Sequence, residues 1–258
     1  MSQTIVNEIS GWGDWNASRY LSTYYASPAS DTYKTLDFIV ETLNSYKGTP
    51  FKKALEFGSG PTLFGALAVA PYVNELHVSD YLEKNLLEIS KWVDNKNDAF
   101  NWDECTKYIL SKEGVVPSPQ NVINRSNDLK LKLTQTLFGD ITKESPLSTI
   151  CTDYDLVTSL FCAESITSSK SEWKNYIKNL LSLASPKGLV LVSALRNCKM
   201  YRVGDKYFPC ANVNEVDLRE AIIAGNNNIE DILIETHSVP DCENEGFVSI
   251  MFARVKLK

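Results

Sequence analysis

The sequence predicts an α/β fold with a largely parallel sheet that carries helices on both faces. Short segments rich in leucine and β-branched residues alternate with longer amphipathic segments, and a glycine-rich turn follows the first of them. The chain has 258 residues, which suffice to bury a large core. Because no internal repeat or low-complexity segment interrupts the alternation, we expect residues 1–258 to form a single domain.

The first 45 residues precede the first expected strand and are rich in aromatic side chains. Tyr20 and Tyr24 have the i, i+4 spacing of one helix face, and the apolar residues between 31 and 43 recur with helical spacing. The residue types in 1–45 fit two roles equally well: a helix that packs on the sheet, or a lid that closes over a ligand.

The next segments predict two strand–helix units, which an insertion follows. Strands are expected at 53–58 and 75–80, and helices at 61–71 and 81–93. Residues 94–138 then depart from the alternation, because they are polar, rich in lysine and interrupted by a Pro-Ser-Pro break. We expect this segment to form a surface insertion of helices rather than a separate domain.

After the insertion the alternation resumes, and apolar segments again separate helical ones. Within the insertion a helix is expected at 122–137; beyond it, strands are expected at 138–141, 154–161, 188–193, 231–238 and 246–256, and helices at 173–184 and 213–224. A turn is expected at 185–188, and residues 201–208 around Gly204 predict a hairpin.

The glycine turn and the acid that follows it predict a nucleoside-cofactor site. Gly58 and Gly60 let the backbone approach a ligand closely, and Asp80, at the end of the next strand, suits a ribose diol. A dinucleotide-binding turn would have a third glycine where this chain has Leu63, and no lysine follows as in a P-loop. The pattern therefore favours S-adenosylmethionine (SAM) over NAD or ATP, and it disfavours an NAD-dependent oxidoreductase.

Ligands of open α/β sheets bind beyond the carboxyl ends of the strands, where this chain carries small or polar residues. We expect Gly58 and Gly60 to face the methionine part and the ribose, and Asp80 to accept hydrogen bonds from the ribose hydroxyls. Asp140 is expected to accept from the adenine amino group, with Ile141 against the ring. For any single aspartate, a role as turn or helix cap remains open.

Composition excludes several classes of function. The net charge of −6 disfavours a nucleic-acid binder, which would show a basic face. No apolar run approaches the length of a membrane span, and residues 1–8 lack the pattern of a signal peptide. Six scattered cysteines without a CxxC pair predict neither a metal site nor a disulfide framework. We expect a cytoplasmic monomer.

Five segments carry a resemblance to a known family: Tyr20-Leu-Ser-Thr-Tyr-Tyr25, Gly58-Ser-Gly-Pro-Thr62, Asp80-Tyr81, Phe161-Cys-Ala-Glu164 and Tyr201-Arg-Val-Gly204. Together they resemble the small-amine methyltransferases, which include the nicotinamide, phenylethanolamine, indolethylamine and thioether enzymes. The resemblance runs through nearly the whole chain. It implies a Rossmann-like class I SAM-dependent methyltransferase fold with a mostly parallel seven-stranded sheet, an N-terminal helical lid and a helical insertion. It also implies that the region 193–212 lies on the substrate side.

The resemblance also implies roles for individual residues. The cofactor-binding set is Tyr20, Tyr25, Gly58, Ser59, Gly60, Thr62, Asp80, Tyr81, Asn85, Asp140, Ile141, Ser159 and Leu160. The substrate-binding set is Tyr24, Phe161, Glu164, Ser193, Asn197, Tyr201 and Cys210. Glu164 falls where the family keeps an acidic residue close to the accepting nitrogen, which makes it the catalytic candidate; a helix cap is the alternative.

The substrate half of this chain departs from the family pattern. Ser193 stands where the nicotinamide enzyme has an aspartate, and Asn197 aligns with a substrate-binding glutamate of the phenylethanolamine enzyme. We therefore expect SAM-dependent methylation of the nitrogen of a small amine or N-heterocycle, without the specificity of the nicotinamide enzyme. A sulfur or carbon acceptor on the same fold, or a SAM-binding protein without catalysis, are the alternatives.

Overall fold

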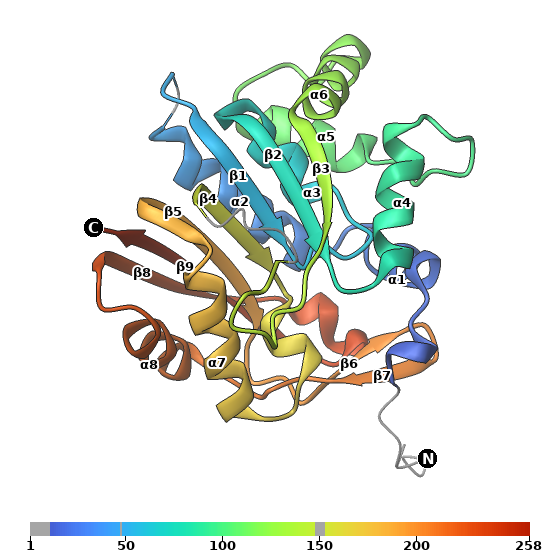
Figure 1. Cartoon of the computed structure of the whole chain (residues 1–258). Helices are drawn as coiled ribbons and strands as arrows, with labels where there is room; N and C mark the ends of the chain where they lie inside the picture. The colour runs from blue at the N-terminus through green and yellow to red at the C-terminus, as the bar shows by residue number, and fades with distance from the viewer. Residues whose placement is uncertain (1–10, 47, 148–152) are drawn as a thin grey trace.

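The computed structural model describes residues 11–46, 48–147 and 153–258, and its centre is a seven-stranded sheet (Figure 1). The strands are β1 (Phe51–Phe57), β2 (Val73–Asp80), β3 (Leu133–Phe138), β4 (Tyr154–Leu160), β5 (Ala184–Leu195), β8 (Ile229–Ser238) and β9 (Ser249–Leu257). Their order is β3-β2-β1-β4-β5-β9-β8. β9 runs in the opposite direction to the other strands of this sheet, which are parallel to one another. The predicted Rossmann-like, mostly parallel sheet is confirmed.

Helices cover both faces of the sheet. They are α1 (Ala17–Tyr24), α2 (Ser30–Asn44), α3 (Phe64–Val69), α4 (Glu83–Val93), α5 (Asp103–Lys112), α6 (Pro119–Lys132), α7 (Lys170–Leu181) and α8 (Glu215–Gly225). Short 3₁₀ helices in the described part of the chain are η1 (Trp12–Asp14), η2 (Ala70–Tyr72), η3 (Ala163–Ile166) and η4 (Pro240–Glu245). Apolar side chains of α2, α3 and α5 form a core on one face, and those of α7 and α8 form a second core on the other (Figure 1). Among the described helices, none combines the length and the apolar character that a bilayer span requires.

Three sequence expectations about elements were wrong. The strand expected at 138–141 is not formed there, because β3 ends at Phe138. The predicted helix at 122–137 ends with α6 at Lys132, and residues 133–138 form β3, which pairs with β2 at the edge of the sheet. This stretch holds two threonines and a phenylalanine, which favour a strand once a neighbour is available. The predicted turn at 185–188 is part of β5, where a register shift against β4 accommodates it.

The chain order of the sheet places a ligand site at its centre. From β1 the sheet grows toward β2 and β3 on one side and toward β4 and β5 on the other. Loops after β1 and β4 therefore leave in opposite directions, and a crevice opens between them at the carboxyl ends of the strands.

The N-terminal segment lies over that crevice and is held by a hairpin. The hairpin consists of β6 (Met200–Val203) and β7 (Lys206–Pro209). The Tyr24 hydroxyl donates to the carbonyl of Arg202 at 2.8 Å, and Arg19 forms an ion pair with Asp205 at the hairpin turn. From the other side, the Lys84 ammonium on α4 donates to the carbonyl of Trp12 at 3.1 Å. Residues 1–10 of the expected lid segment lie outside the described residues.

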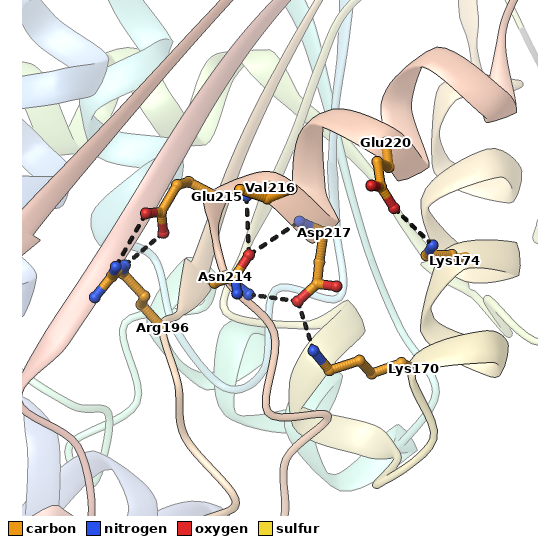
Figure 2. Close-up of polar contacts among 8 residues, drawn as sticks. All are labelled: Lys170, Lys174, Arg196, Asn214, Glu215, Val216, Asp217 and Glu220. Carbon is orange, nitrogen blue, oxygen red and sulfur yellow. Dashed lines mark hydrogen bonds and ion pairs between the residues drawn. The ribbon is translucent and has the colours of Figure 1, made fainter.

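Polar contacts join α8 to α7 and to the end of β5 (Figure 2). Asn214 and Asp217 form a capping box, in which each side chain accepts from the backbone amide of the other residue. Lys170 on α7 binds Asp217 at 2.6 Å, and Arg196 beyond β5 binds Glu215 through two hydrogen bonds (Figure 2). These contacts hold the loop after β5, next to the crevice.

Candidate active site

A cavity of about 400 Å³ opens at the carboxyl ends of β1, β2, β3 and β4. The predicted site residues that line it are Tyr20, Tyr24, Tyr25, Gly58, Ser59, Gly60, Thr62, Asp80, Tyr81, Asn85, Asp140, Ile141, Leu160, Phe161 and Tyr201. They come from six separate segments of the chain. The volume falls in the range of cofactor and small-ligand pockets.

The floor of the cavity is the glycine turn after β1. Gly58 and Gly60 have φ angles of +67° and +61°, a region in which other residues are strained. A Cβ atom at Gly58 would lie 2.1 Å from Sγ of Cys162, so the backbone also needs glycine for space. At Gly60 the nearest atom to a Cβ would be on the Tyr20 ring, at 3.9 Å, so this ring lies over the turn.

Asp80 connects the glycine turn to the start of α4. Its Oδ2 accepts from the Gly60 amide at 2.8 Å, and its Oδ1 accepts from the Leu82 amide at 2.8 Å and from Asn85 at 2.9 Å. Burial raises the pKa of Asp80, and these donors act in the opposite direction. An ionised carboxylate has about four acceptor positions, so Asp80 can still accept from a ligand hydroxyl.

The wall formed by the loop after β3 is polar at one point and apolar beside it. Asp140 accepts from the amide of Thr142 at 3.0 Å and from its hydroxyl at 2.6 Å. Ile141 is buried, and its carbonyl accepts from Asn179 on α7 at 2.8 Å. The loop therefore presents a carboxylate and an apolar side chain in a defined position, which suits the edge and face of a planar base.

Aromatic side chains form the roof. Trp15 donates through Nε1 to Asn85 at 2.8 Å, and its ring centroid is 4.9 Å from that of Tyr20. Tyr20 in turn lies 5.0 Å from Tyr24 and 5.9 Å from Tyr25 between ring centroids. The aromatic segment thus closes over the cavity rather than only packing on the sheet.

The loop after β4 forms the opposite side of the cavity. Phe161 has a φ of +54°, an unusual conformation for a bulky residue. Its amide donates to Oγ of Ser193 at 3.1 Å. Ser193 was predicted to bind substrate, but it is buried and does not line the cavity; its observed contact instead holds the Phe161 backbone.

Glu164 lies in η3, directly behind the cavity wall. Its Oε1 accepts from the Leu195 amide at 2.9 Å and from the Ser165 hydroxyl at 3.3 Å, and both of these residues line the cavity. Its Oε2 is buried without a hydrogen-bond partner among the described residues. Burial raises the pKa of Glu164 to about 7. The result is a carboxyl group that can exchange a proton near neutral pH.

Three other predicted residues do not line the cavity. Ser159 is buried within β4, and its Oγ has no partner in the described part of the chain. Asn197 lies in a separate hollow with Glu243 and Val248. Cys210 is buried, and its thiol faces that of Cys198. Asn197 and Cys210 belong to the predicted substrate-binding set, in which the chain departs from the family pattern, whereas Ser159 belongs to the predicted cofactor-binding set.

Several lining residues were not predicted from sequence. They include Trp12, Trp15, Asp31, Phe57, Phe64, Lys143, Cys162, Leu195 and Phe247. The aromatic cluster in residues 1–45 could have indicated Trp12 and Trp15 as lining residues. No local pattern indicates Asp31 or Phe247, because the helix and the loop that bring them to the cavity are far apart in sequence. Glu56 on β1 is another buried carboxyl group, although it does not line the cavity; burial raises its pKa to about 8, while the Ala66 amide lowers it.

The chain is similar in sequence to known proteins over nearly its whole length. A family model described as NNMT/PNMT/TEMT matches residues 4–255. The chain is 26% identical over 245 residues to indolethylamine N-methyltransferase of Oryctolagus cuniculus, which covers 92% of each chain. It is 27% identical over 250 residues to nicotinamide N-methyltransferase of Homo sapiens, with the same coverage of both chains.

Solved structures show the same fold at lower identity. A magnesium protoporphyrin IX methyltransferase from Synechocystis with bound SAM gives a TM-score of 0.55 at 15% identity, over 92% of this chain and 89% of that one. The N-methyltransferase NodS from Bradyrhizobium japonicum with bound S-adenosylhomocysteine gives 0.52 at 11% identity, over 93% and 96%. Within the described ranges, no cluster of three His, Cys, Asp or Glu side chains could hold a metal ion.

Proposed function

The chain belongs to the NNMT/PNMT/TEMT family, and from this premise we propose that it methylates the nitrogen of a small amine or N-heteroaromatic molecule. Its cofactor is SAM, and the second product is S-adenosylhomocysteine. The sulfonium supplies an already activated methyl group. The protein therefore contributes alignment of donor and acceptor in a dry site, which lowers such barriers by about 7–11 kcal/mol in favourable cases.

The cavity suits this cofactor by shape and by donor set. Asp80 and the Gly58–Gly60 turn would hold the ribose and the methionine part, and Asp140 with Ile141 would hold the adenine. The open acceptor positions of Asp80 and the close backbone at Gly60 support this assignment. Tyr20, over the glycine turn, would separate the cofactor from water. These roles are proposals for the residues of this chain.

The observation that favours a nitrogen acceptor is the carboxyl group of Glu164. An alkylammonium must lose a proton before it can accept a methyl group, whereas a sulfur acceptor needs no base. The Oε2 oxygen of Glu164 has no hydrogen-bond partner among the described residues, and its Oε1 oxygen accepts from two residues that line the cavity. Burial and the charge of Glu164 raise the pKa of Tyr20 and of Tyr201, which both line the cavity. A pKa of about 7 suits proton transfer at neutral pH.

The roof of the cavity favours small acceptors. The aromatic segment is held by α4 and by the β6–β7 hairpin, so a bulky acceptor would have to displace both. The net charge of −6 also disfavours a nucleic-acid substrate, which a basic surface would bind. We therefore propose a small molecule as the acceptor, a monomer as the working unit and the cytoplasm as its compartment.

The experiment is a measurement of S-adenosylhomocysteine formation with a panel of pyridines, arylethylamines, alkylamines and thioethers. Turnover with a nitrogen class and none with thioethers supports the proposal. Turnover with thioethers alone assigns the chain to sulfur chemistry. SAM binding without turnover of any acceptor would count against amine methylation and in favour of a binding protein.

A further inference from the structure

Asp31 is a second buried carboxylate at the cavity, separate from Glu164. It lies in the first turn of α2, lines the cavity and has a relative exposure of 6%. Its Oδ1 is buried without a hydrogen-bond partner among the described residues. Burial raises the pKa of Asp31 to about 6, while the Thr32 amide and the Cys242 thiol lower it. A buried carboxyl oxygen without a donor raises the free energy of the folded protein unless a ligand donates a hydrogen bond to it.

Stabilisation of helix α2 does not explain why the Oδ1 oxygen of Asp31 is buried at the cavity. An acid in the first turn often stabilises a helix through its dipole. Here Asp241 of η4 already serves the N-terminus of α2, because it accepts from the amide and the hydroxyl of Ser30 at 2.9 and 2.8 Å. Asp31 is bound by the Thr32 amide of the same turn and also lines the cavity, and its Oδ1 is left without a donor among the described residues.

The other acidic residues of the cavity wall differ from Asp31. Asp80 accepts from three protein donors, and Asp140 accepts from Thr142 and lies 3.9 Å from the Lys143 ammonium. Among the carboxylates that line the cavity, Asp31 is the one for which the described residues show a buried oxygen with no donor.

Aromatic rings surround this carboxylate. Burial and the charge of Asp31 raise the pKa of Tyr20, Tyr24 and Tyr25. These three tyrosines and Phe247 all line the cavity. A carboxylate among ring faces favours a cation over a neutral or anionic group. Beyond the effect of burial, the charges of Asp31 and of Glu164 both raise the pKa of Tyr20. The two carboxyl groups therefore lie near the same ring and come from different elements, α2 and η3.

We propose that Asp31 binds a positively charged group of the substrate, at the end remote from the nitrogen that accepts the methyl group. This inference rests on the proposed function and narrows it. The substrate class is a small molecule with two basic nitrogens: one faces Glu164 and the donor methyl, and the other stays protonated against Asp31. Asp31 thus determines specificity, while Glu164 handles the proton of the acceptor.

The test uses acceptors that differ only in the remote group. The probes are 4-(aminomethyl)pyridine, 4-(hydroxymethyl)pyridine and 4-ethylpyridine, which have similar size and the same ring nitrogen. They are compared with wild type, Asp31→Asn and the control Glu41→Gln, which removes one charge from the exposed face of α2. Rates of S-adenosylhomocysteine formation are measured above pH 6, where Asp31 is ionised.

We expect wild type and Glu41→Gln to prefer the aminomethyl probe over the ethyl probe by about tenfold or more in kcat/KM, as for a charge-assisted hydrogen bond. Asp31→Asn should lose that preference, with the ethyl probe changed less than about twofold. Equal use of all three probes by wild type would overturn the inference. So would an equal loss for all three in Asp31→Asn, which would assign Asp31 a structural or general catalytic role.

Binding separates this inference from the proposed function. Calorimetric titration of the same probes into protein saturated with S-adenosylhomocysteine needs no turnover. A preference for the aminomethyl cation that disappears in Asp31→Asn would support the cation site even if no acceptor is methylated. The absence of such a preference in binding would refute the cation site even if amine methylation is found. Unchanged affinity of Asp31→Asn for S-adenosylhomocysteine shows that the variant is folded.

Discussion

The amide of Gly60 donates a hydrogen bond of 2.8 Å to Oδ2 of Asp80. This bond joins the glycine turn after β1 to the acidic end of β2. The other oxygen of Asp80 accepts from Asn85, which accepts from Trp15 in the aromatic segment. A continuous set of hydrogen bonds therefore runs from the aromatic segment through α4 to the floor of the cavity, and it couples the proposed lid to the proposed cofactor site.

Asp80→Ala should weaken binding of SAM without unfolding the chain. Hydrogen bonds to a charged group contribute about 1.5–3 kcal/mol, so a loss of roughly ten- to hundredfold in affinity is expected. The three protein donors also lose their acceptor, and a lower Tm is expected. Calorimetry with S-adenosylhomocysteine measures the affinity, and Glu83→Gln on the exposed side of α4 is the control. Unchanged affinity in Asp80→Ala would refute the ribose assignment.

Trp15→Phe should loosen the lid while it keeps an aromatic ring in place. The variant removes the donor to Oδ1 of Asn85, a buried acceptor, at a cost of about 1–3 kcal/mol. Because this bond connects the lid to the cofactor site, S-adenosylhomocysteine should dissociate faster, which stopped-flow fluorescence can measure. Dissociation at the wild-type rate would mean that the lid is held by ring packing alone.

Glu164→Gln should lower the methylation rate of an alkylamine by about 10²–10⁴-fold and leave affinity for SAM nearly unchanged. A pyridine acceptor has no proton to lose, so its rate in the same variant serves as the control and should fall much less. In wild type, kcat for the alkylamine should rise with pH through about 7, because the base must be ionised. Equal losses for both acceptors would indicate a structural role for Glu164.

Glu56 should make the unliganded protein less stable as pH rises. Its pKa is raised by burial from 4.5 to about 8, so the folded state keeps a proton that the unfolded state releases above pH 4.5. The stability from this group is full below pH 4.5 and is lost as pH rises through about 8. Glu56→Gln should flatten the dependence of Tm on pH between pH 4.5 and 8. Asp31 and Glu164 titrate in this interval in both proteins, so the difference between the variant and wild type reports Glu56. An unchanged slope in this interval would contradict the buried, protonated state of Glu56.

The parts of the fold that the sequence predicted are those with a strong local pattern. The strand around Leu55, the glycine turn and the strand that ends at Asp80 follow from periodicity and spacing alone. β3 was missed because its residues continue a helical run without a break, and only pairing with β2 makes a strand favourable there. Local preference was weak in that segment, so the neighbouring strand decided its structure.

The same distinction applies to the site. The sequence by itself determined the glycine turn and the acid after it, because Gly58, Gly60 and Asp80 act through backbone geometry and strand ends, which short-range spacing encodes. Only the tertiary structure decided which distant segments complete the cavity wall. Packing of α2 and of the loop after η4 brings Asp31 and Phe247 to the cavity. Long loops and helices separate these residues in sequence, and no local pattern specifies where such segments meet.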